Sequence, residues 1–267
     1  MKVAFEFLVD FIVSVSAGNR LIAGLLAGTI CMILTFLGAV PSALGSRVSK
    51  SMLDIGLGFS AGIMLVAAFT SLILPGIEVG GTFPVVIGFI IGAITIIGIE
   101  RFLPHLHMIK GVEGGERFRE RIKAVWMLVL AVIIHNFPEG LAVGASVSYN
   151  IREGILTAIA IGIQDIPEGL TVSLPLVGIG VRRRSALLIG LLSGASEPIM
   201  ALIPIFLTSV ANFLLPYTLG FAAGMMIFVV SHEIIPETHR HGFEDQATIG
   251  LLIGFIIMLI LDSIFSA

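Results

Sequence analysis

The sequence contains few charged residues and a single cysteine, and each shortage excludes a class of protein. Only 12% of its 267 residues are charged, whereas soluble domains carry roughly a quarter, so a soluble globular protein is excluded. A net charge of −3 is too small for a nucleic-acid-binding surface, and we expect no nucleic-acid partner. Cys31 is the only cysteine and can form neither an internal disulfide nor a cage of thiolates. Hydrophobic residues make up 57% of the chain and place it in a lipid bilayer.

Eight apolar stretches are long enough to cross a bilayer, which requires about 20 residues of helix. The sequence therefore predicts an all-α polytopic membrane protein with a single transmembrane domain, residues 1–267. Residues 1–17 are shorter and more polar than a span, and we expect them to form a helix at the membrane interface. The predicted spans are Leu21–Val40, Leu53–Leu74, Thr82–Ile99, Ala124–Tyr149, Ile155–Val181, Ala186–Val210, Phe213–Ile235 and Ile249–Ser266.

The basic residues predict how the chain is oriented. Twelve of the 15 Lys and Arg residues lie in the loops that follow spans 1, 3, 5 and 7, and six of them lie in one loop, residues 100–123. Cytoplasmic loops of membrane proteins carry the excess of Lys and Arg. We therefore expect these four loops in the cytoplasm, and both termini on the opposite side of an inner or plasma membrane.

The chain also repeats part of its own sequence. Leu57–Met64 in span 2 matches Leu219–Met226 in span 7, and each stretch is followed by a proline, Pro75 or Pro236. An odd number of crossings separates the two spans, so they run in opposite directions. This pattern is typical of transporters built from inverted repeats. It predicts a 3+2+3 arrangement, in which spans 1–3 and 6–8 are the inverted units and spans 4 and 5 lie between them.

Two related motifs, His135–Gly140 and Gln164–Gly169, lie on the middle spans, and each contains Pro-Glu-Gly followed by Leu. Residues three and four apart share a face of a helix, so His135 lies over Glu139. A carboxylate at the centre of a membrane helix costs about 3 kcal/mol. Proline frees a backbone carbonyl in the preceding turn, and Glu197 adds another carboxylate in span 6. A bound cation is the simplest reason for such a cluster.

The side chains of this cluster favour a first-row divalent ion. They offer one imidazole, several carboxylates and two amides, with the Met64 thioether as a further candidate. Glu139 and Glu168 lie between two groups of ligands and could bridge a pair of ions. A lone His or Glu-Pro step is often only a packing feature, but the joint occurrence on three spans favours a metal site. Two alternatives stay open: an intramembrane metalloenzyme, although His-Glu-x-x-His is absent, and a metal-independent, proton-coupled carrier.

At these motifs the sequence resembles the ZIP (Zrt-/Irt-like) family of divalent metal transporters, in particular its prokaryotic members. The resemblance extends to Ser231–Glu233 in span 7 and covers nearly the whole chain. It implies a homodimer that is not an enzyme, has no organic cofactor and moves Zn²⁺, or else Cd²⁺, Fe²⁺ or Mn²⁺, into the cytoplasm. Many members have a His where this chain has Gln164. The resemblance implies a transport site of His135, Glu139, Gln164, Glu168 and Met64, and a second site of Asn136, Glu139, Asp165, Glu168 and Glu197.

Further polar residues are expected along the path of the ion. Ser71, in the outer part of span 2, is a candidate for the entrance. For His239 and His241, an ordinary solvated loop is an equally good interpretation. The candidates for a cytoplasmic exit are His232, Glu233, Asp54, His105, His107, His239 and His241.

Overall fold

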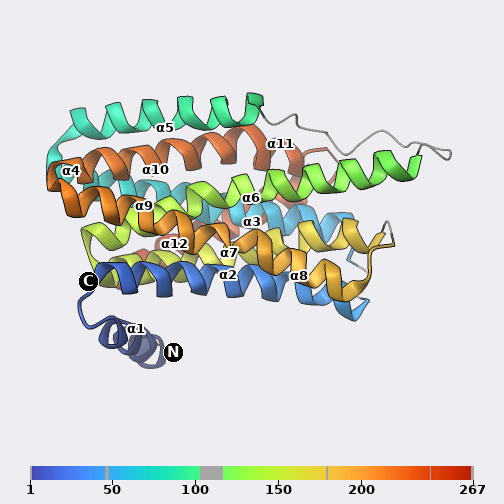
Figure 1. Cartoon of the computed structure of the whole chain (residues 1–267), viewed down its shortest axis with the longest axis horizontal. Helices are drawn as coiled ribbons and strands as arrows, with labels where there is room; N and C mark the ends of the chain where they lie inside the picture. Colours follow the sequence, from blue (N-terminus) through green and yellow to red (C-terminus); the bar gives the residue numbers. More distant parts are fainter. Residues whose placement is uncertain (1, 46–47, 103–116, 179, 241, 266–267) are drawn as a thin grey trace.

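The computed structural model describes residues 2–45, 48–102, 117–178, 180–240 and 242–265, and these residues form helices without any strand. The helices run roughly parallel or antiparallel in one bundle, with α1 set apart at one end (Figure 1). Three short segments, η1, η2 and η3, are π or 3-10 turns. In chain order the elements are α1 (Lys2–Ser16), α2 (Arg20–Leu44), α3 (Lys50–Ala67), η1 (Ala68–Ile73), α4 (Leu74–Gly80), α5 (Thr82–Phe102), α6 (Arg117–Tyr149), α7 (Ile151–Gly178), α8 (Arg183–Gly194), α9 (Ser196–Val210), η2 (Asn212–Leu214), α10 (Leu215–Val229), η3 (Val230–Ile234), α11 (Ile235–Thr238) and α12 (Glu244–Phe265).

Seven helical segments within the described residues are long and apolar enough to cross a membrane. They coincide with predicted spans 1, 2, 3, 5, 6, 7 and 8, which confirms an all-α polytopic membrane protein. The fourth predicted span falls in α6, which has 33 residues but is not among the seven. The count of eight therefore stays a prediction.

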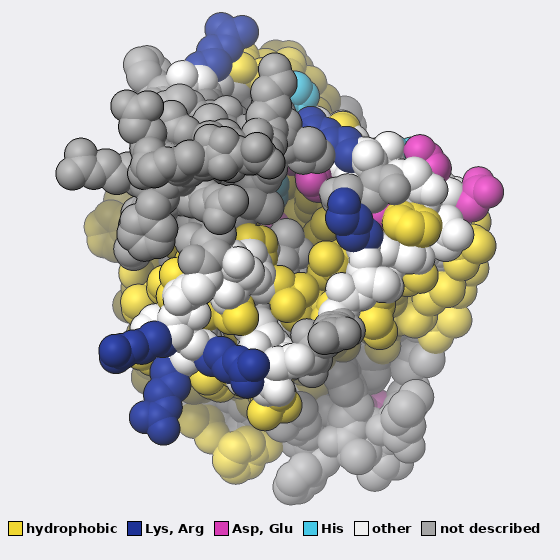
Figure 2. Space-filling view, turned by 90° about the vertical axis from the view of Figure 1, so that its right-hand side faces the viewer, with side chains coloured by type: hydrophobic (Ala, Val, Ile, Leu, Met, Phe, Trp, Pro, Cys, Tyr) yellow, Lys and Arg dark blue, Asp and Glu magenta, His cyan; other side chains and the backbone are white. Residues whose placement is uncertain are grey.

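The end of α2 and the start of α8 lie at one end of the bundle, and α1 and the end of α12 lie toward the other end (Figure 1). A side chain at Gly45, after α2, would meet the guanidinium of Arg183 at the start of α8, so these two loops are neighbours. Lys and Arg side chains gather on this end of the molecule (Figure 2). This arrangement agrees with the prediction that the loops rich in Lys and Arg lie on one side of the membrane. That this side faces the cytoplasm stays a prediction.

Glycines allow close backbone packing in two pairs of helices, α3–α12 and α5–α10, which we call the zipped pairs. On α3 and α12, a Cβ added at Gly62 would meet the backbone of Leu251 and Phe255, and one at Gly254 would meet the backbone of Phe59. The α5–α10 pair is built in the same way, with Gly224 against Phe89. Small residues allow this close approach of backbones in a membrane. In sequence order, Gly58, Gly62, Gly88 and Gly92 each recur 162 positions later, as Gly220, Gly224, Gly250 and Gly254.

The two π turns, η1 and η3, show the same spacing in the sequence as the glycines. η1 begins at Ala68 and η3 begins at Val230, again 162 positions apart. Each turn is followed by a short helix with proline in its first turn, Pro75 in α4 and Pro236 in α11. Equal spacing of glycines and π turns supports the predicted inverted repeat. π turns are often found at functional sites, and η3 contributes a residue to the site described below.

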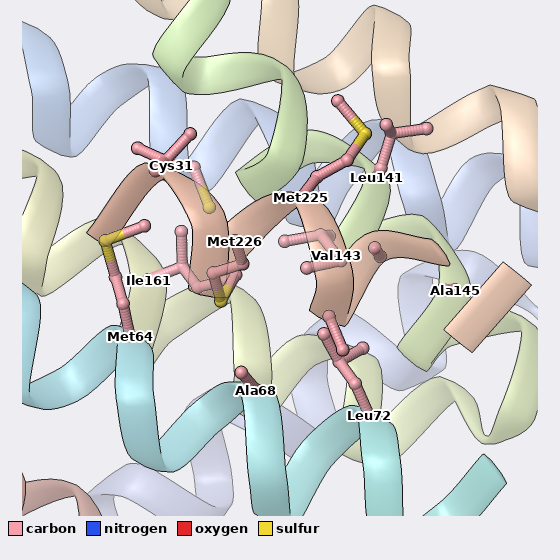
Figure 3. Packing of buried hydrophobic residues seen from close by; sticks show 14 of the residues in the cluster. Cys31, Met64, Ala68, Leu72, Leu141, Val143, Ala145, Ile161, Met225 and Met226 are labelled. Carbon is pink, nitrogen blue, oxygen red and sulfur yellow. The ribbon is translucent and has the colours of Figure 1, made fainter. Parts of the chain in front are cut away.

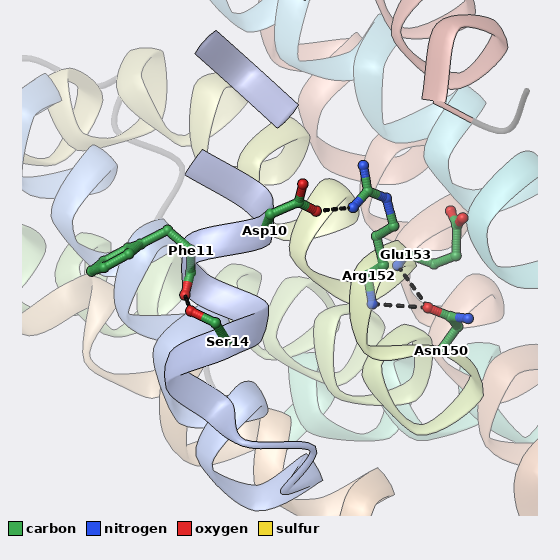
Figure 4. A network of polar contacts seen from close by, with 6 residues as sticks. All are labelled: Asp10, Phe11, Ser14, Asn150, Arg152 and Glu153. Atoms are coloured by element: carbon green, nitrogen blue, oxygen red, sulfur yellow. Dashed lines mark hydrogen bonds and ion pairs between the residues drawn. The ribbon is translucent and has the colours of Figure 1, made fainter. Parts of the chain in front are cut away.

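Helix α1 packs against the bundle through a small apolar cluster that includes Val9, Ile155 and Ile159. Asp10 forms an ion pair with Arg152 in the first turn of α7 (Figure 4). The Asn150 side chain accepts hydrogen bonds from the backbone N–H groups of Arg152 and Glu153 and so caps α7. These contacts tie α1 to α7, whereas its predicted place at the membrane interface stays a prediction.

Candidate metal site

Four carboxylates from three different helices are buried inside the bundle. Glu139 is on α6, Asp165 and Glu168 are on α7, and Glu197 is at the start of α9. Their exposed fractions are 0%, 1%, 6% and 0%, respectively. Both long helices continue through the prolines of their motifs, Pro138 in α6 and Pro167 in α7. The structure therefore brings the sequence-predicted acidic residues into the protein interior, away from solvent.

The glycine of each motif allows these helices to approach one another. A Cβ at Gly140 would lie 2.6 Å from the Glu197 carbonyl oxygen, so α6 and α9 touch where Glu197 begins its helix. A Cβ at Gly169 would collide with the Thr35 carbonyl on α2. A Cβ at Gly28, also on α2, would lie 2.5 Å from the Pro198 Cα. The glycines of the two motifs are thus required for packing, next to glutamates that supply the charge.

Polar neighbours fix part of the cluster. The Thr35 hydroxyl donates to Glu197 Oε1 at 3.1 Å, and the Gln164 amide donates from Nε2 to Asp165 Oδ1 at 2.5 Å. Asn136 donates from Nδ2 to the Ser193 carbonyl at 2.9 Å, which leaves its amide oxygen as the atom suited to a metal. Such contacts orient ligands before the ion arrives.

Seven buried oxygen atoms of the cluster have no hydrogen-bond partner among the described residues. They are both carboxylate oxygens of Glu139, both of Glu168, Oδ2 of Asp165, Oε2 of Glu197 and Oε1 of Gln164. The four carboxylates also repel one another electrostatically, and His135 attracts Glu139 and Glu168. Buried polar atoms are nearly always paired, and unpaired buried charges are strongly destabilising. Buried oxygen atoms left without partners are suited to a divalent cation.

One half of the cluster includes a residue that the sequence did not single out for this role. A ligand atom from each of Cys31, Asp165 and Glu197 lies within 4.8 Å of the other two. Cys31 is fully buried on α2, one turn before Thr35, and its thiol donates to the Ala158 carbonyl at 3.1 Å. The four-residue spacing of Cys31 and Thr35 puts both on one face of a helix, but nothing in the sequence indicates that this face meets Glu197.

The other half of the cluster includes Glu233, which the sequence placed at the cytoplasmic exit. Its Oε2 lies 3.0 Å from His135 Nε2, and the two side chains are 19% and 16% exposed. Glu233 belongs to the π turn η3, so a distortion of span 7 carries this carboxylate to the edge of the central cluster. Contact between α6 and η3 could not be read from local spacing.

Met64 lies in the apolar core that surrounds the motifs. It is fully buried in the same cluster as Cys31, Ile161 and Met226, which is its counterpart 162 positions later (Figure 3). The structure thus places Met64 on the same core as Cys31, but its polar contacts with the carboxylates stay a prediction.

The remaining sequence-predicted residues are spread over spans 2 and 7. Ser71 is half-buried in η1, and Asp54 is buried near the start of α3. His232 is exposed, with its ring 4.9 Å from that of Phe228. The ring Nδ1 of His239 lies 2.9 Å from the Ile235 carbonyl. His105, His107 and His241 lie outside the described residues.

Fold and site together define a class: a polytopic helical membrane protein with a buried carboxylate, histidine and thiol cluster suited to a divalent cation. Residues 107–262 match the family described as ZIP Zinc transporter. The chain belongs to this family, as its motifs suggested. ZIP proteins are transporters rather than enzymes, and the metalloenzyme alternative finds no support.

Several relatives cover most of the chain. The zinc transporter ZIPB of Bordetella bronchiseptica is 43% identical over 261 residues, which span 92% of this chain and 82% of the relative. The zinc transporter GufA of Myxococcus xanthus is 38% identical, over 92% of this chain and 98% of its own. The zinc transporter ZupT of Corynebacterium glutamicum is 35% identical, over 91% and 96%. Bacterial proteins among these relatives support the prokaryotic branch of the family.

Proposed function

We propose that this protein carries zinc ions into the cytoplasm through the buried carboxylate cluster. The observation that carries the proposal is the set of unpartnered, buried oxygens contributed by three helices. Zinc is favoured among divalent ions because the relatives are named zinc transporters. Cd²⁺, Fe²⁺ and Mn²⁺ are further candidates for the same set of ligands.

The proposal places two ions side by side in the cluster. The transport ion is assigned to His135, Glu139, Gln164 and Glu168, with Met64 completing its shell. The second ion is assigned to Asn136, Glu139, Asp165, Glu168 and Glu197. The unpartnered oxygens of Glu139 and Glu168 support their shared role, because each carboxylate has two free atoms to offer. Two positive ions would also relieve the mutual repulsion of the four acidic groups.

Transport requires access to the cluster from each side in turn. Helices of the glycine-zipped pairs α3–α12 and α5–α10 carry none of the four clustered carboxylates, whereas α6, α7 and α9 carry them all. Motion of the carboxylate-bearing helices against the zipped pairs would expose the ions alternately. The basic loops are assigned to the cytoplasm, both termini to the outside, and the protein to a homodimer in an inner or plasma membrane.

Uptake by proteoliposomes tests the proposal. Wild-type protein should accumulate Zn²⁺, and Glu139→Ala and Glu168→Ala should abolish accumulation. Asp10→Asn is the matched control, because Asp10 is an exposed carboxylate on α1 outside the cluster. Unchanged uptake in both glutamate variants would refute the assignment. Failure of the purified wild type to bind Zn²⁺ or Cd²⁺ would favour the metal-independent, proton-coupled carrier instead.

A further inference from the structure

We infer that Cys31 is a ligand of the second ion, together with Asp165 and Glu197, and that it biases this half of the cluster toward ions that bind thiolate. The inference rests on the proposed function and sharpens its specificity. It assigns a sulfur atom to a site that otherwise consists of oxygen ligands. Zn²⁺ and Cd²⁺ would gain from this ligand, whereas Mn²⁺ prefers carboxylate, carbonyl and water oxygens.

Distances in this group fit a single ion after a small adjustment. The three ligand atoms lie within 4.8 Å of one another. Around a tetrahedral Zn²⁺, with bonds of about 2.0–2.3 Å, two ligand atoms lie roughly 3.3–3.8 Å apart. A contraction of at most about 1.0–1.5 Å therefore closes the site, and rotation of the carboxylate side chains can supply it.

Two unpartnered oxygens in the same place are a second, independent observation. Asp165 Oδ2 and Glu197 Oε2 are buried and have no hydrogen-bond partner among the described residues. Their companion oxygens are held by Gln164 Nε2 and by the Thr35 hydroxyl. Each carboxylate is therefore anchored through one oxygen, with the other oxygen left for a ligand. Thr35 and the cysteine share one face of α2, so the same helix orients one ligand and supplies another.

The thiol itself is poorly satisfied by its present contact. Its Sγ donates to the Ala158 carbonyl, at 3.1 Å, and a thiol is a weak hydrogen-bond donor. An ion would displace the S–H proton and bind the resulting thiolate. A buried cysteine can also act merely as a small apolar residue. That interpretation predicts no metal–sulfur bond, so spectroscopy separates the two.

Absorption of the purified wild-type protein with Co²⁺ or Cd²⁺ tests for the metal–sulfur bond directly. A bound thiolate gives a ligand-to-metal charge-transfer band in the near ultraviolet, and the chain contains no second cysteine that could produce it. We expect this band in the wild type and its loss in Cys31→Ser. Ala27→Ser is a matched control, since it adds a hydroxyl at another fully buried position of α2 and should keep the band. Absence of the band in wild type saturated with metal would overturn the inference.

Affinity provides a second measurement. Loss of an outer-shell partner alone weakens metal binding about 10- to 100-fold, so Cys31→Ser should weaken Cd²⁺ binding by at least about tenfold. Mn²⁺ binding should change much less. Equal losses for both ions, or none, would overturn the inference while wild-type Zn²⁺ uptake left the proposed function intact. A band that persists in Asp165→Asn/Glu197→Gln would also overturn it, because the metal would then bind Cys31 elsewhere.

Discussion

Gly140→Ala tests whether the glycine of the first motif positions a metal ligand. Gly140 lies on α6 next to Glu139, and an added Cβ would lie 2.6 Å from the Glu197 carbonyl oxygen and 2.8 Å from the Met200 Cβ. Carbon atoms in good contact are about 3.5–4.0 Å apart. The methyl group must therefore push α9 away from α6 by roughly 1 Å, and Glu197 moves with α9.

The expected effect on the site is larger than the effect on stability. Overpacking of this kind costs about 1–3 kcal/mol, and each kcal/mol lowers Tm by about 2–4 °C in a protein of this size. Metal–ligand distances, in contrast, tolerate a deviation of only about 0.2 Å from their ideal values. A shift of roughly 1 Å should therefore weaken binding of the second ion at least tenfold, the lower range for a disturbed metal shell.

Calorimetric titration with Zn²⁺ and thermal unfolding in the same detergent would measure the two effects together. Gly98→Ala is the control, because a Cβ at this helical glycine of α5 meets nothing within 4 Å. It should leave binding unchanged and stabilise the helix by up to about 1 kcal/mol. Wild-type Zn²⁺ affinity in Gly140→Ala, or an equal loss in Gly98→Ala, would refute the argument that close packing positions Glu197.

Three further variants probe the charges of the cluster. Glu139→Gln should abolish Zn²⁺ uptake yet raise the Tm of the metal-free protein, since it removes one of several mutually repelling carboxylates; a lower Tm would contradict this. Thr35→Val removes the hydrogen bond to Glu197 Oε1 and should weaken Zn²⁺ binding about 10- to 100-fold, as titration would show. Glu233→Gln should reduce the rate of Zn²⁺ uptake more than the Zn²⁺ affinity, because the Glu233 carboxylate binds the His135 ring once the ion has left. Equal losses of rate and affinity would count against this role.

The sequence was sufficient to predict much of the fold, because the physical signals are local. Long apolar runs require helices in a membrane, and the structure has helices at all eight predicted places, seven of which are long and apolar enough to span within the described residues. Glycines four residues apart, such as Gly58 and Gly62, allow helix backbones to approach closely, and the α3–α12 and α5–α10 contacts show this approach. Carboxylates in apolar runs, such as Glu139 and Glu168, had to be buried together with a partner.

Contacts that depend on tertiary packing could not be predicted. Cys31 and Thr35 are small, neutral residues in an apolar helix, so nothing in their composition distinguishes them from packing residues. They reach Glu197 only because α2 lies against α9. Glu233 is predicted at the exit from its place near the cytoplasmic end of span 7. Its contact with His135 joins the π turn η3 to α6, two elements far apart in the sequence, and local spacing does not predict such a contact.

The inverted repeat makes a prediction of its own, because it implies that the two zipped pairs are energetically equivalent. A Cβ at Gly62 would lie 2.6 Å from the Phe255 backbone nitrogen, and a Cβ at its counterpart Gly224 would lie 2.8 Å from the Phe89 carbonyl carbon. Since both insert a methyl group between packed backbones, Gly62→Ala and Gly224→Ala should each cost about 1–3 kcal/mol and lower Tm by similar amounts.

Neither variant of the zipped pairs should share the defect of Gly140→Ala. Gly62 and Gly224 face the partner helices of their own pairs, because an added Cβ would meet Leu251 and Phe255 of α12 or Phe89 of α5. Zn²⁺ affinity of the folded fraction should therefore fall much less than the tenfold expected for Gly140→Ala. If only one variant destabilised the protein, the two halves of the repeat would be similar in sequence but would contribute unequally to stability. If either weakened Zn²⁺ binding as much as Gly140→Ala, the packing within the zipped pairs would position the metal ligands as strictly as the packing of α6 against α9.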